Sequence, residues 1–190
     1  MDEAVPIALN IGSQLSLVKN IEKVEESITE VLKSILETRE KSKGKIVGGL
    51  LVVYGDFSDV VFDVEQMGEN PFAGQLVTIY DTDICDVLID HMSNVQNDGA
   101  ILVNVDGQFI TGNAYLVIRD LRGEKPPNTG TRHLAASAFS KRDDILSCFV
   151  LSETRNTVVK FAEGEIKGSF TFTNKPTEVK SGVKKTSKAS

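Results

Sequence analysis

The stretch DGAILVNVDGQFITGNAYLVI, residues 98–118, decides the predicted fold. Its two apolar segments, Ala100–Val105 and Gln108–Ile118, are separated by Asp106-Gly107, a dipeptide that favours the tight turn between antiparallel strands. We therefore predict a β-hairpin. Upstream, Ile46–Tyr54 is apolar almost without interruption, which is typical of a strand that is buried on both faces of a sheet. The hairpin and this strand together predict the centre of a β-sheet.

Helices and further strands are predicted around this centre. Between Ser16 and Glu40, apolar residues recur at the spacing of one helix face. Asp81-Thr82-Asp83 can cap a second helix over residues 84–95, and Thr131 can cap a third helix over Arg132–Ser140. Loops are predicted at 56–74 and 119–130, and further strands at 75–80, 145–152, 157–161 and near 169–173. The predicted fold class is α/β, a mixed central β-sheet surrounded by helices.

Composition divides the 190 residues into three regions. Residues 1–43 form a predicted N-terminal amphipathic helical region. Residues 44–174 form one predicted domain, which is long enough to bury a core without a metal or a disulfide. In residues 175–190, lysines alternate with Ser, Thr and Gly, and this composition buries too little apolar surface to offset the entropy of ordering. We expect a disordered Lys/Ser-rich tail.

Charge and cysteine content exclude several classes of function. The chain carries 21 Lys and Arg against 27 Asp and Glu, a formal net charge of −6, so no specific nucleic-acid binding is predicted. Cys85 and Cys148 lie in apolar surroundings and are interpreted as reduced, buried thiols. No window of about 18 residues is apolar enough to span a membrane, and no basic flank precedes the apolar residues 5–11. We expect a cytoplasmic protein without a membrane span.

Two short motifs could carry chemistry. Asp98-Gly99-Ala100 lies where a loop enters a buried strand, so that a carboxylate is held there and the glycine lets a ligand approach the backbone; an ordinary turn would have the same sequence. Thr129–Ala136 lies at a loop-to-helix junction. A helix N-terminus offers unpaired N–H groups, to which this segment adds hydroxyls and an arginine, a combination suited to phosphate. The alternative is a capped helix with an exposed Arg132 and a core His133.

Two further clusters are open to more than one interpretation. Ser152-Glu153-Thr154 follows a strand, where ligand-binding groups often lie, but a solvated turn would look the same. The acids of Asp81-Thr82-Asp83, with Asp86 and Asp90, could form a cation site. We favour helix caps and a solvated helix face for them, because a helix N-terminus stabilises acidic side chains.

In their order and setting, these motifs resemble the diadenylate cyclase (DAC) domain of the DisA N-terminal type. The hallmarks of that family are an Asp-Gly-Ala before a strand and a Gly-Thr-Arg-His-x-Ala-Ala helix start, matched here by Asp98–Ala100 and Gly130–Ala136. A strand that ends in Val-Ser-Glu resembles Leu151-Ser152-Glu153. The resemblance covers about residues 44–166 and is closest to the archaeal-type branch. It implies that residues 44–174 are a catalytic domain with the DAC fold.

The resemblance implies an enzyme that condenses two ATP into cyclic di-AMP and two pyrophosphates. Each 3′-hydroxyl would attack the α-phosphate of the other ATP, assisted by Mn²⁺ or Mg²⁺, across a face-to-face dimer. The implied partners are therefore ATP, cyclic di-AMP and further copies of this chain. Oligomerisation would be part of the mechanism, and the Ser16–Glu40 helix could support it or could simply cover the sheet.

The resemblance also assigns roles to particular residues. It implies that Asp98, Arg132 and His133 are catalytic and that Asp98 and Glu153 bind the metal. The nucleotide-binding set that it implies is Gly99, Ala100, Tyr115, Leu116, Gly130, Thr131, Arg132, His133, Ser152 and Glu153.

Three positions depart from the family pattern. Leu134 stands where many members have a second arginine, Asn97 where many bacterial members have histidine, and Thr154 where a second acid is usual. These departures leave open an alternative function, a catalytically weak or inactive module that senses ATP or cyclic di-AMP.

Overall fold

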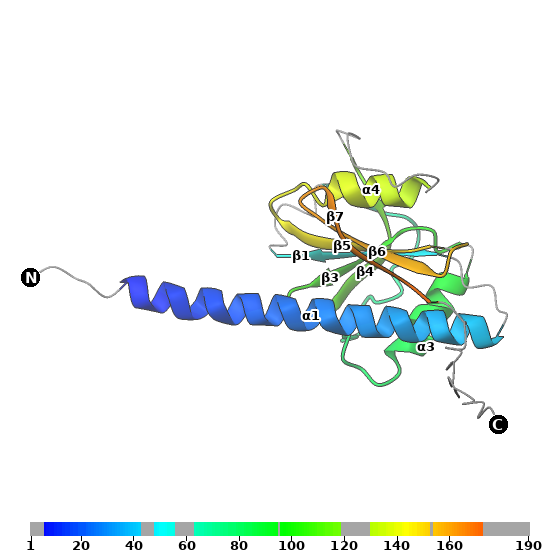
Figure 1. Ribbon diagram of the computed structural model, residues 1–190, viewed down its shortest axis with the longest axis horizontal. Coiled ribbons are helices and arrows are strands. Elements are labelled where there is room, and N and C mark those ends of the chain that lie inside the picture. The colour runs from blue at the N-terminus through cyan, green and yellow to red at the C-terminus, as the bar shows by residue number, and fades with distance from the viewer. Residues whose placement is uncertain are drawn as a thin grey trace, which may run out of the picture.

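A seven-stranded mixed sheet forms the centre of the computed structural model, which describes residues 6–42, 48–55, 63–94, 96–118, 130–152 and 154–172 (Figure 1). Within the N-terminal helix, side chains are described for residues 15–38. The helices are α1 (Pro6–Ser42), α3 (Ile84–Ser93) and α4 (Thr131–Phe139). The strands are β1 (Gly49–Tyr54), β2 (Val64–Gln66), β3 (Ala100–Asn104), β4 (Phe109–Leu116), β5 (Ile145–Leu151), β6 (Thr157–Ala162) and β7 (Glu165–Thr171).

The strand order is β2-β4-β3-β1-β5-β6-β7, with β1 in the middle. Strand β1 pairs parallel with β3 and antiparallel with β5, and every other pairing is antiparallel. All six residues of β1 are buried, as the sequence predicts for a central strand. The predicted hairpin is β3–β4, and Gly107 in its turn has a φ of 82°, which a side chain would disfavour. The predicted fold class, an α/β fold with a mixed central sheet, is confirmed.

Helices cover both faces of the sheet (Figure 1). Side chains alternate along β1, so Leu51 and Val53 pack with α1 and α3, while Leu50 and Val52 face α4. On the first face, α1 contributes five fully buried side chains to the core: Val24, Ile28, Leu32, Ile35 and Leu36. The second half of α1 therefore belongs to the same core as the sheet.

The first half of α1 extends beyond the sheet (Figure 1). Helix α1 begins at Pro6, about ten residues before the predicted start. Its exposed apolar residues include Leu17, whose surface is 45 % exposed, and Val18, whose surface is 51 % exposed. Among the described residues, no helix is both long and apolar enough to cross a membrane.

Several predictions of secondary structure were wrong in detail. Residues 75–80 do not form a strand: Thr78 makes an isolated bridge to Gln108 and is held in a turn, where its backbone N–H and Oγ1 donate to the carboxylate of Asp81 at 2.9 and 2.8 Å. These two bonds lower the pKa of Asp81. Asp83 is the N-cap of α3, but its side chain makes no capping bond.

The predicted loop over 56–74 contains strand β2, which is too short and too exposed to give an apolar pattern. Strand β7 begins at Glu165, before the predicted 169. The sequence carries no sign of this earlier start, because the first residues of this edge strand are exposed. Cys148 is buried as predicted, whereas Cys85 is only half-buried; both are free thiols. The predicted tail at 175–190 and the loop at 119–129 lie outside the described residues.

The two halves of α1 should differ in their contribution to stability. Replacing Ile28 by Ala leaves a cavity beneath the sheet and should lower the free energy of unfolding by about 2–5 kcal/mol. Leu17→Ala, the matched change in the exposed half, should alter it by less than about 0.5 kcal/mol. Urea denaturation of both variants measures the difference, and equal effects would contradict the packing of α1.

Candidate active site

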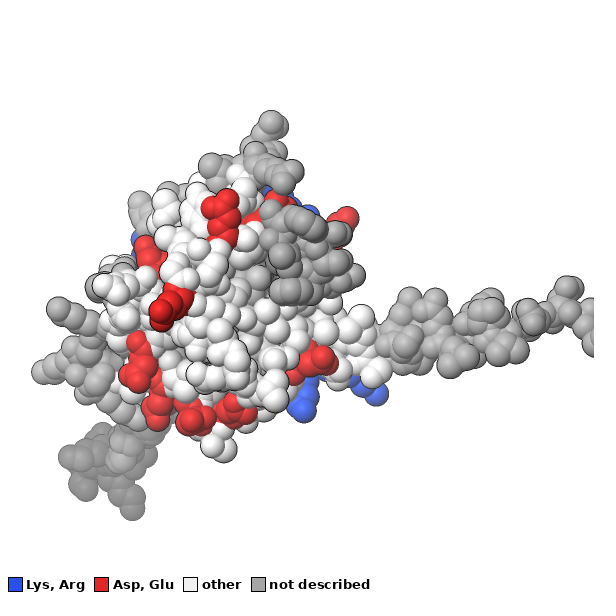
Figure 2. Space-filling view, turned by 180° about the vertical axis from the view of Figure 1, so that it is seen from behind, with Lys and Arg blue, Asp and Glu red and all other residues white. Residues whose placement is uncertain are grey.

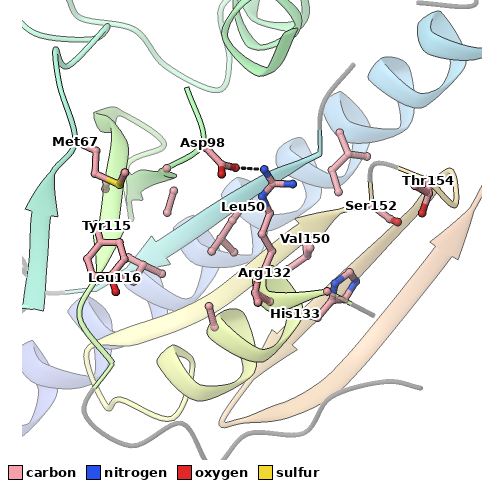
Figure 3. A pocket seen from close by; sticks show the side chains of 17 residues that line it. Leu50, Met67, Asp98, Tyr115, Leu116, Arg132, His133, Val150, Ser152 and Thr154 are labelled. Atoms are coloured by element: carbon pink, nitrogen blue, oxygen red, sulfur yellow. Dashed lines mark hydrogen bonds and ion pairs between the residues drawn. The ribbon is translucent and has the colours of Figure 1, made fainter. Parts of the chain in front are cut away.

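A cavity of about 610 Å³ lies on the α4 side of the sheet (Figure 3). Every sequence-predicted site residue that the structure describes lines this cavity. These residues are Asp98, Gly99, Ala100, Tyr115, Leu116, Gly130, Thr131, Arg132, His133 and Ser152. The remaining predicted residue, Glu153, lies outside the described residues. Segments separated by more than 50 residues in the chain thus meet at one place.

Strand register explains the floor of the cavity. Leu50 of β1 is opposite Val150 of β5, and Ala100 of β3 is opposite Ala114 of β4. The parallel pairing of Leu51 with Ile101 places Leu50 beside Ala100. The four side chains therefore form one apolar row across β4, β3, β1 and β5, and all four line the cavity. We call this set, Ala114, Ala100, Leu50 and Val150, the floor row.

The N-terminus of α4 forms one wall. Gly130 is the N-cap and Thr131 the first helical residue, so the prediction that Thr131 caps the helix was wrong by one position. Gly130 has no side chain to cap this end, and none of the other described residues makes a capping hydrogen bond there. The first N–H groups of a helix lack partners within the helix and carry partial positive charge. This end of α4 therefore offers hydrogen-bond donors to an anion in the cavity.

Helix α4 is anchored firmly enough to hold these donors in place. The Ser137 hydroxyl donates to the Gly164 carbonyl at 2.6 Å, and the Gly164 N–H donates to Ser140 Oγ at 3.1 Å. Both serines are buried, so the small residues of this segment let the helix lie directly against the β6–β7 turn. The wall is thus a rigid part of the domain.

Asp98 and Arg132 form an ion pair across the cavity (Figure 3). The side chain of Asp98 is 69 % exposed and that of Arg132 is 26 % exposed. One side chain comes from the loop before β3 and the other from the first turn of α4. The two motifs that the sequence analysis singled out independently are therefore two sides of one site.

His133 and Ser152 lie toward one end of the cavity, near Thr154 (Figure 3). The His133 ring is buried and packs edge-on against Phe161, with ring centroids 6.3 Å apart. Ser152 follows β5, and its N–H donates to the Thr157 carbonyl at 2.8 Å. The contact between the His133 ring and Phe161 helps to hold His133 in position.

Tyr115 and Met67 form the opposite end of the cavity (Figure 3). Tyr115 is 55 % exposed and Met67 is 49 % exposed. The N–H of Met67 donates to the Asn113 carbonyl at 2.8 Å, which extends the β2–β4 ladder by one bond. An aromatic ring and a polarisable thioether on an apolar rim suit a flat, unsaturated ring system.

Met67, Leu50, Val150 and Ala114 line the cavity but were missed by the sequence analysis. Leu50 and Val150 lie in continuous apolar runs, where only the strand register distinguishes a floor residue from a core residue. Met67 lies in a segment that was predicted as loop, so no pattern indicated its orientation.

The one carboxylate described in the cavity fits a metal whose other ligands come from a bound molecule. Among the described residues there is no group of three or more His, Cys, Asp or Glu side chains that could hold a metal ion, and this includes the acids around Asp81. Asp98 is the described carboxylate in the cavity. Mg²⁺ is commonly bound by one or two carboxylates together with substrate phosphates, which matches this arrangement.

The face of the molecule seen in Figure 2 does not favour anions. Acidic side chains are spread over the face seen in Figure 2, and the few basic ones lie near its margin. With a net charge of −6, the protein repels a polyphosphate at long range. Attraction therefore depends on local groups, above all Arg132 and the N-terminus of α4.

Comparison with known proteins gives matches to both the sequence and the fold. The family model described as "DisA bacterial checkpoint controller nucleotide-binding" matches residues 36–166. A diadenylate cyclase from Methanocaldococcus jannaschii is 30 % identical over 148 residues, which cover 76 % of this chain and 45 % of the relative. The chain thus spans less than half the length of that curated relative. The match is consistent with the predicted archaeal-type branch.

Two solved structures share the fold. A hypothetical membrane-spanning protein from Bacillus cereus matches with a TM-score of 0.54 and 21 % identity, over 75 % of this chain and 61 % of that one. A double variant of DacA from Staphylococcus aureus matches with a TM-score of 0.51 and 19 % identity, over 78 % of this chain and 87 % of that one. At these identities the likeness concerns the fold alone.

Gly99 should be essential to the shape of the site. A Cβ at this position would lie 2.2 Å from the backbone carbon of Asn113 in β4, which cannot move without shifting the strand. We expect Gly99→Ala to lower the free energy of unfolding by about 1–3 kcal/mol. Gly168→Ala, where a Cβ meets no atom within 4 Å, should be neutral or slightly stabilising. Denaturant titration compares them, and a Gly99→Ala variant as stable as the parent would refute this close contact.

Proposed function

Because this chain belongs to the diadenylate cyclase (DAC) family, we propose that it condenses two ATP molecules into cyclic di-AMP and two pyrophosphates. The observation that carries the proposal is the ion pair of Asp98 with Arg132, set between an apolar floor and an uncapped helix N-terminus. This arrangement combines an acceptor for a hydroxyl proton, a cation for phosphate and a surface for a base.

The ATP would lie along the length of the cavity. Its adenine would rest on the floor row and against Tyr115, because these groups are apolar or aromatic. The ribose would approach the backbone at Gly99, where no side chain intervenes. Leu116 would complete the contact with the base, as the family resemblance suggests.

The triphosphate would extend toward α4. Backbone N–H groups of its first turn and the Thr131 hydroxyl would donate to phosphate oxygens. The guanidinium of Arg132 is planar and permanently charged, which suits it to bridging two phosphate oxygens. His133 and Ser152 would contact the phosphates from the far end, and Glu153 remains a predicted ligand of the metal.

The reaction requires one bond to form and one to break at each α-phosphorus. The 3′-oxygen of one ATP attacks the α-phosphorus of the other, the bond to the bridging oxygen of the β-phosphate breaks, and pyrophosphate leaves with the bonding electrons. Asp98 would either help to remove the hydroxyl proton or, with Glu153, hold the cation. A bound Mg²⁺ or Mn²⁺ would neutralise charge that develops on the phosphates.

Two copies of the chain would be needed for one product molecule. A cavity of about 610 Å³ is of the size that takes one drug-sized ligand. The second ATP must then come from another copy whose cavity faces the first, so that each 3′-hydroxyl meets the other α-phosphate. The proposed assembly is therefore a homo-oligomer with facing sites, in which proximity supplies much of the rate enhancement.

Asp98→Asn tests the chemical step. The amide cannot take a proton, so the rate of cyclic di-AMP formation should fall about 10²–10⁴-fold. An exposed ion pair contributes at most about 1 kcal/mol, so the dissociation constant of ATP, measured without added divalent metal, should change less than about fivefold. Calorimetry and mass detection of product give the two values.

Asp106→Asn, at the opposite end of the β3–β4 hairpin, is the matched control and should behave as the parent. Equal product from Asp98→Asn and parent would rule out the role of Asp98. ATP binding by the parent without any product would favour the sensing function instead.

Arg132 should act mainly on affinity. Removing a charged donor to phosphate costs about 1.5–3 kcal/mol, so Arg132→Ala should weaken ATP binding about 10–150-fold. Arg132→Lys retains the charge but loses the planar two-point contact, so its affinity for ATP should lie between those of the parent and Arg132→Ala. If Arg132→Ala bound ATP as tightly as the parent in calorimetry, the phosphates would not lie against α4.

A further inference from the structure

Asp98 has an exposed side chain on a tightly held backbone. Its carboxylate is 69 % exposed, and its one hydrogen-bonded side-chain partner among the described residues is Arg132. An exposed side chain with so little packing takes its position from the backbone that carries it. The residues on either side of Asp98, Asn97 and Gly99, must therefore determine where the carboxylate lies.

We propose that Asn97, together with His91 and Asn113, is a positioning unit that sets the location of Asp98 for the reaction. The inference rests on the proposed function and adds residues that do not touch the substrate. None of the three is among the side chains that line the active-site cavity.

Asn97 ties the loop before β3 to two other elements. Its side-chain amide donates to the carbonyl oxygen of His91 at 3.1 Å and lies 3.2 Å from Nδ1 of the same residue. Its Oδ1 accepts a hydrogen bond from Nδ2 of Asn113 at 3.0 Å. One side chain thus connects the end of α3, the loop and β4, directly before Asp98.

His91 is suited to the acceptor role in this contact. It is buried, and desolvation lowers its pKa, so the ring is neutral near pH 7. With the Asn97 amide as donor, Nδ1 accepts and the ring proton lies on Nε2. The ring is held in place by Phe72, whose centroid is 5.8 Å away, and by Gly112.

Asn113 also fixes the residue after Asp98. Its φ of 57° is in the left-handed region, which asparagine tolerates better than most residues, and the β3–β4 register shifts between Ala100 and Leu102. Gly99 rests on this kinked backbone, so closely that a Cβ would lie 2.2 Å from the Asn113 carbonyl carbon. Asn113 thus contacts both neighbours of Asp98: its side chain bonds Asn97, and its backbone packs against Gly99.

Stability alone does not account for this network. The buried atoms Nε2 of His91 and Oδ1 of Asn113 have no hydrogen-bond partner among the described residues. Apolar side chains of similar size would avoid the desolvation of these groups. A partly satisfied network is explained better by the geometry that it imposes on Asp98.

Asn97→Ala, compared with Asn104→Ala, tests the proposal. Asn104 is a matched control because its side chain also holds a loop next to β3: its Oδ1 accepts from the N–H groups of Asp106 and Gln108 at 3.0 and 2.8 Å. These bonds lie at the opposite end of β3 from Asp98 and do not involve the positioning unit. Both variants should lose similar stability in urea denaturation.

Only Asn97→Ala should slow catalysis. A displaced carboxylate should lower kcat for cyclic di-AMP by about 100-fold, while the ATP dissociation constant stays within about twofold, because the phosphate-binding groups are untouched. Asn104→Ala should keep the parental kcat. Equal losses of kcat in both variants, or none in either, would overturn the proposal.

Hydrogen exchange separates this inference from the proposed function. In Asn97→Ala the backbone amides of residues 98–100 should exchange faster than in the parent, and in Asn104→Ala they should not. If the parent forms no product, the proposed function fails, and this exchange result alone decides whether Asn97 positions Asp98. Asn113→Gly permits the left-handed φ but removes the side-chain bonds, so the same amides should exchange faster in this variant too. Unchanged exchange in both Asn97→Ala and Asn113→Gly would refute the positioning unit.

Discussion

The parallel pairing of β1 with β3 is the constraint on which the site depends. It places Leu50 beside Ala100, and the antiparallel neighbours then bring Ala114 and Val150 into the same row. As a result, the loop before β3, the end of β4 and the end of β5 meet at one edge of the sheet. A shift by one residue in β1 would turn its side chains to the other face and remove the floor of the cavity.

The proposed function requires an acidic protein to bind a polyphosphate, so positive charge must be gathered at one place on its surface. Here that charge comes from Arg132 and the first turn of α4, which two buried serines hold against the β6–β7 turn. The pairing of Arg132 with Asp98 balances this charge when no anion is bound. In the proposed complex, ATP with one divalent cation is still negatively charged, and Arg132 and the N-terminus of α4 would offset part of that charge.

Sequence patterns were sufficient to predict the elements whose apolar residues recur regularly or whose ends carry clear turn and helix-start signals. The apolar run of β1, the Asp106-Gly107 turn and the helix after Gly130 all indicated their structures correctly. Strand β2 and Met67 could not be predicted, because three exposed residues carry no apolar pattern. The floor row and the contacts of Asn97 depend on register and on long-range packing, which local propensity does not encode.

We propose that facing copies of this cavity join two ATP molecules. The most direct test incubates the purified parental protein with ATP and Mn²⁺ or Mg²⁺ and measures cyclic di-AMP by mass across a protein dilution series. We expect product whose rate per protein molecule rises with protein concentration. Absence of product at every concentration, with ATP bound in calorimetry, would contradict the claim.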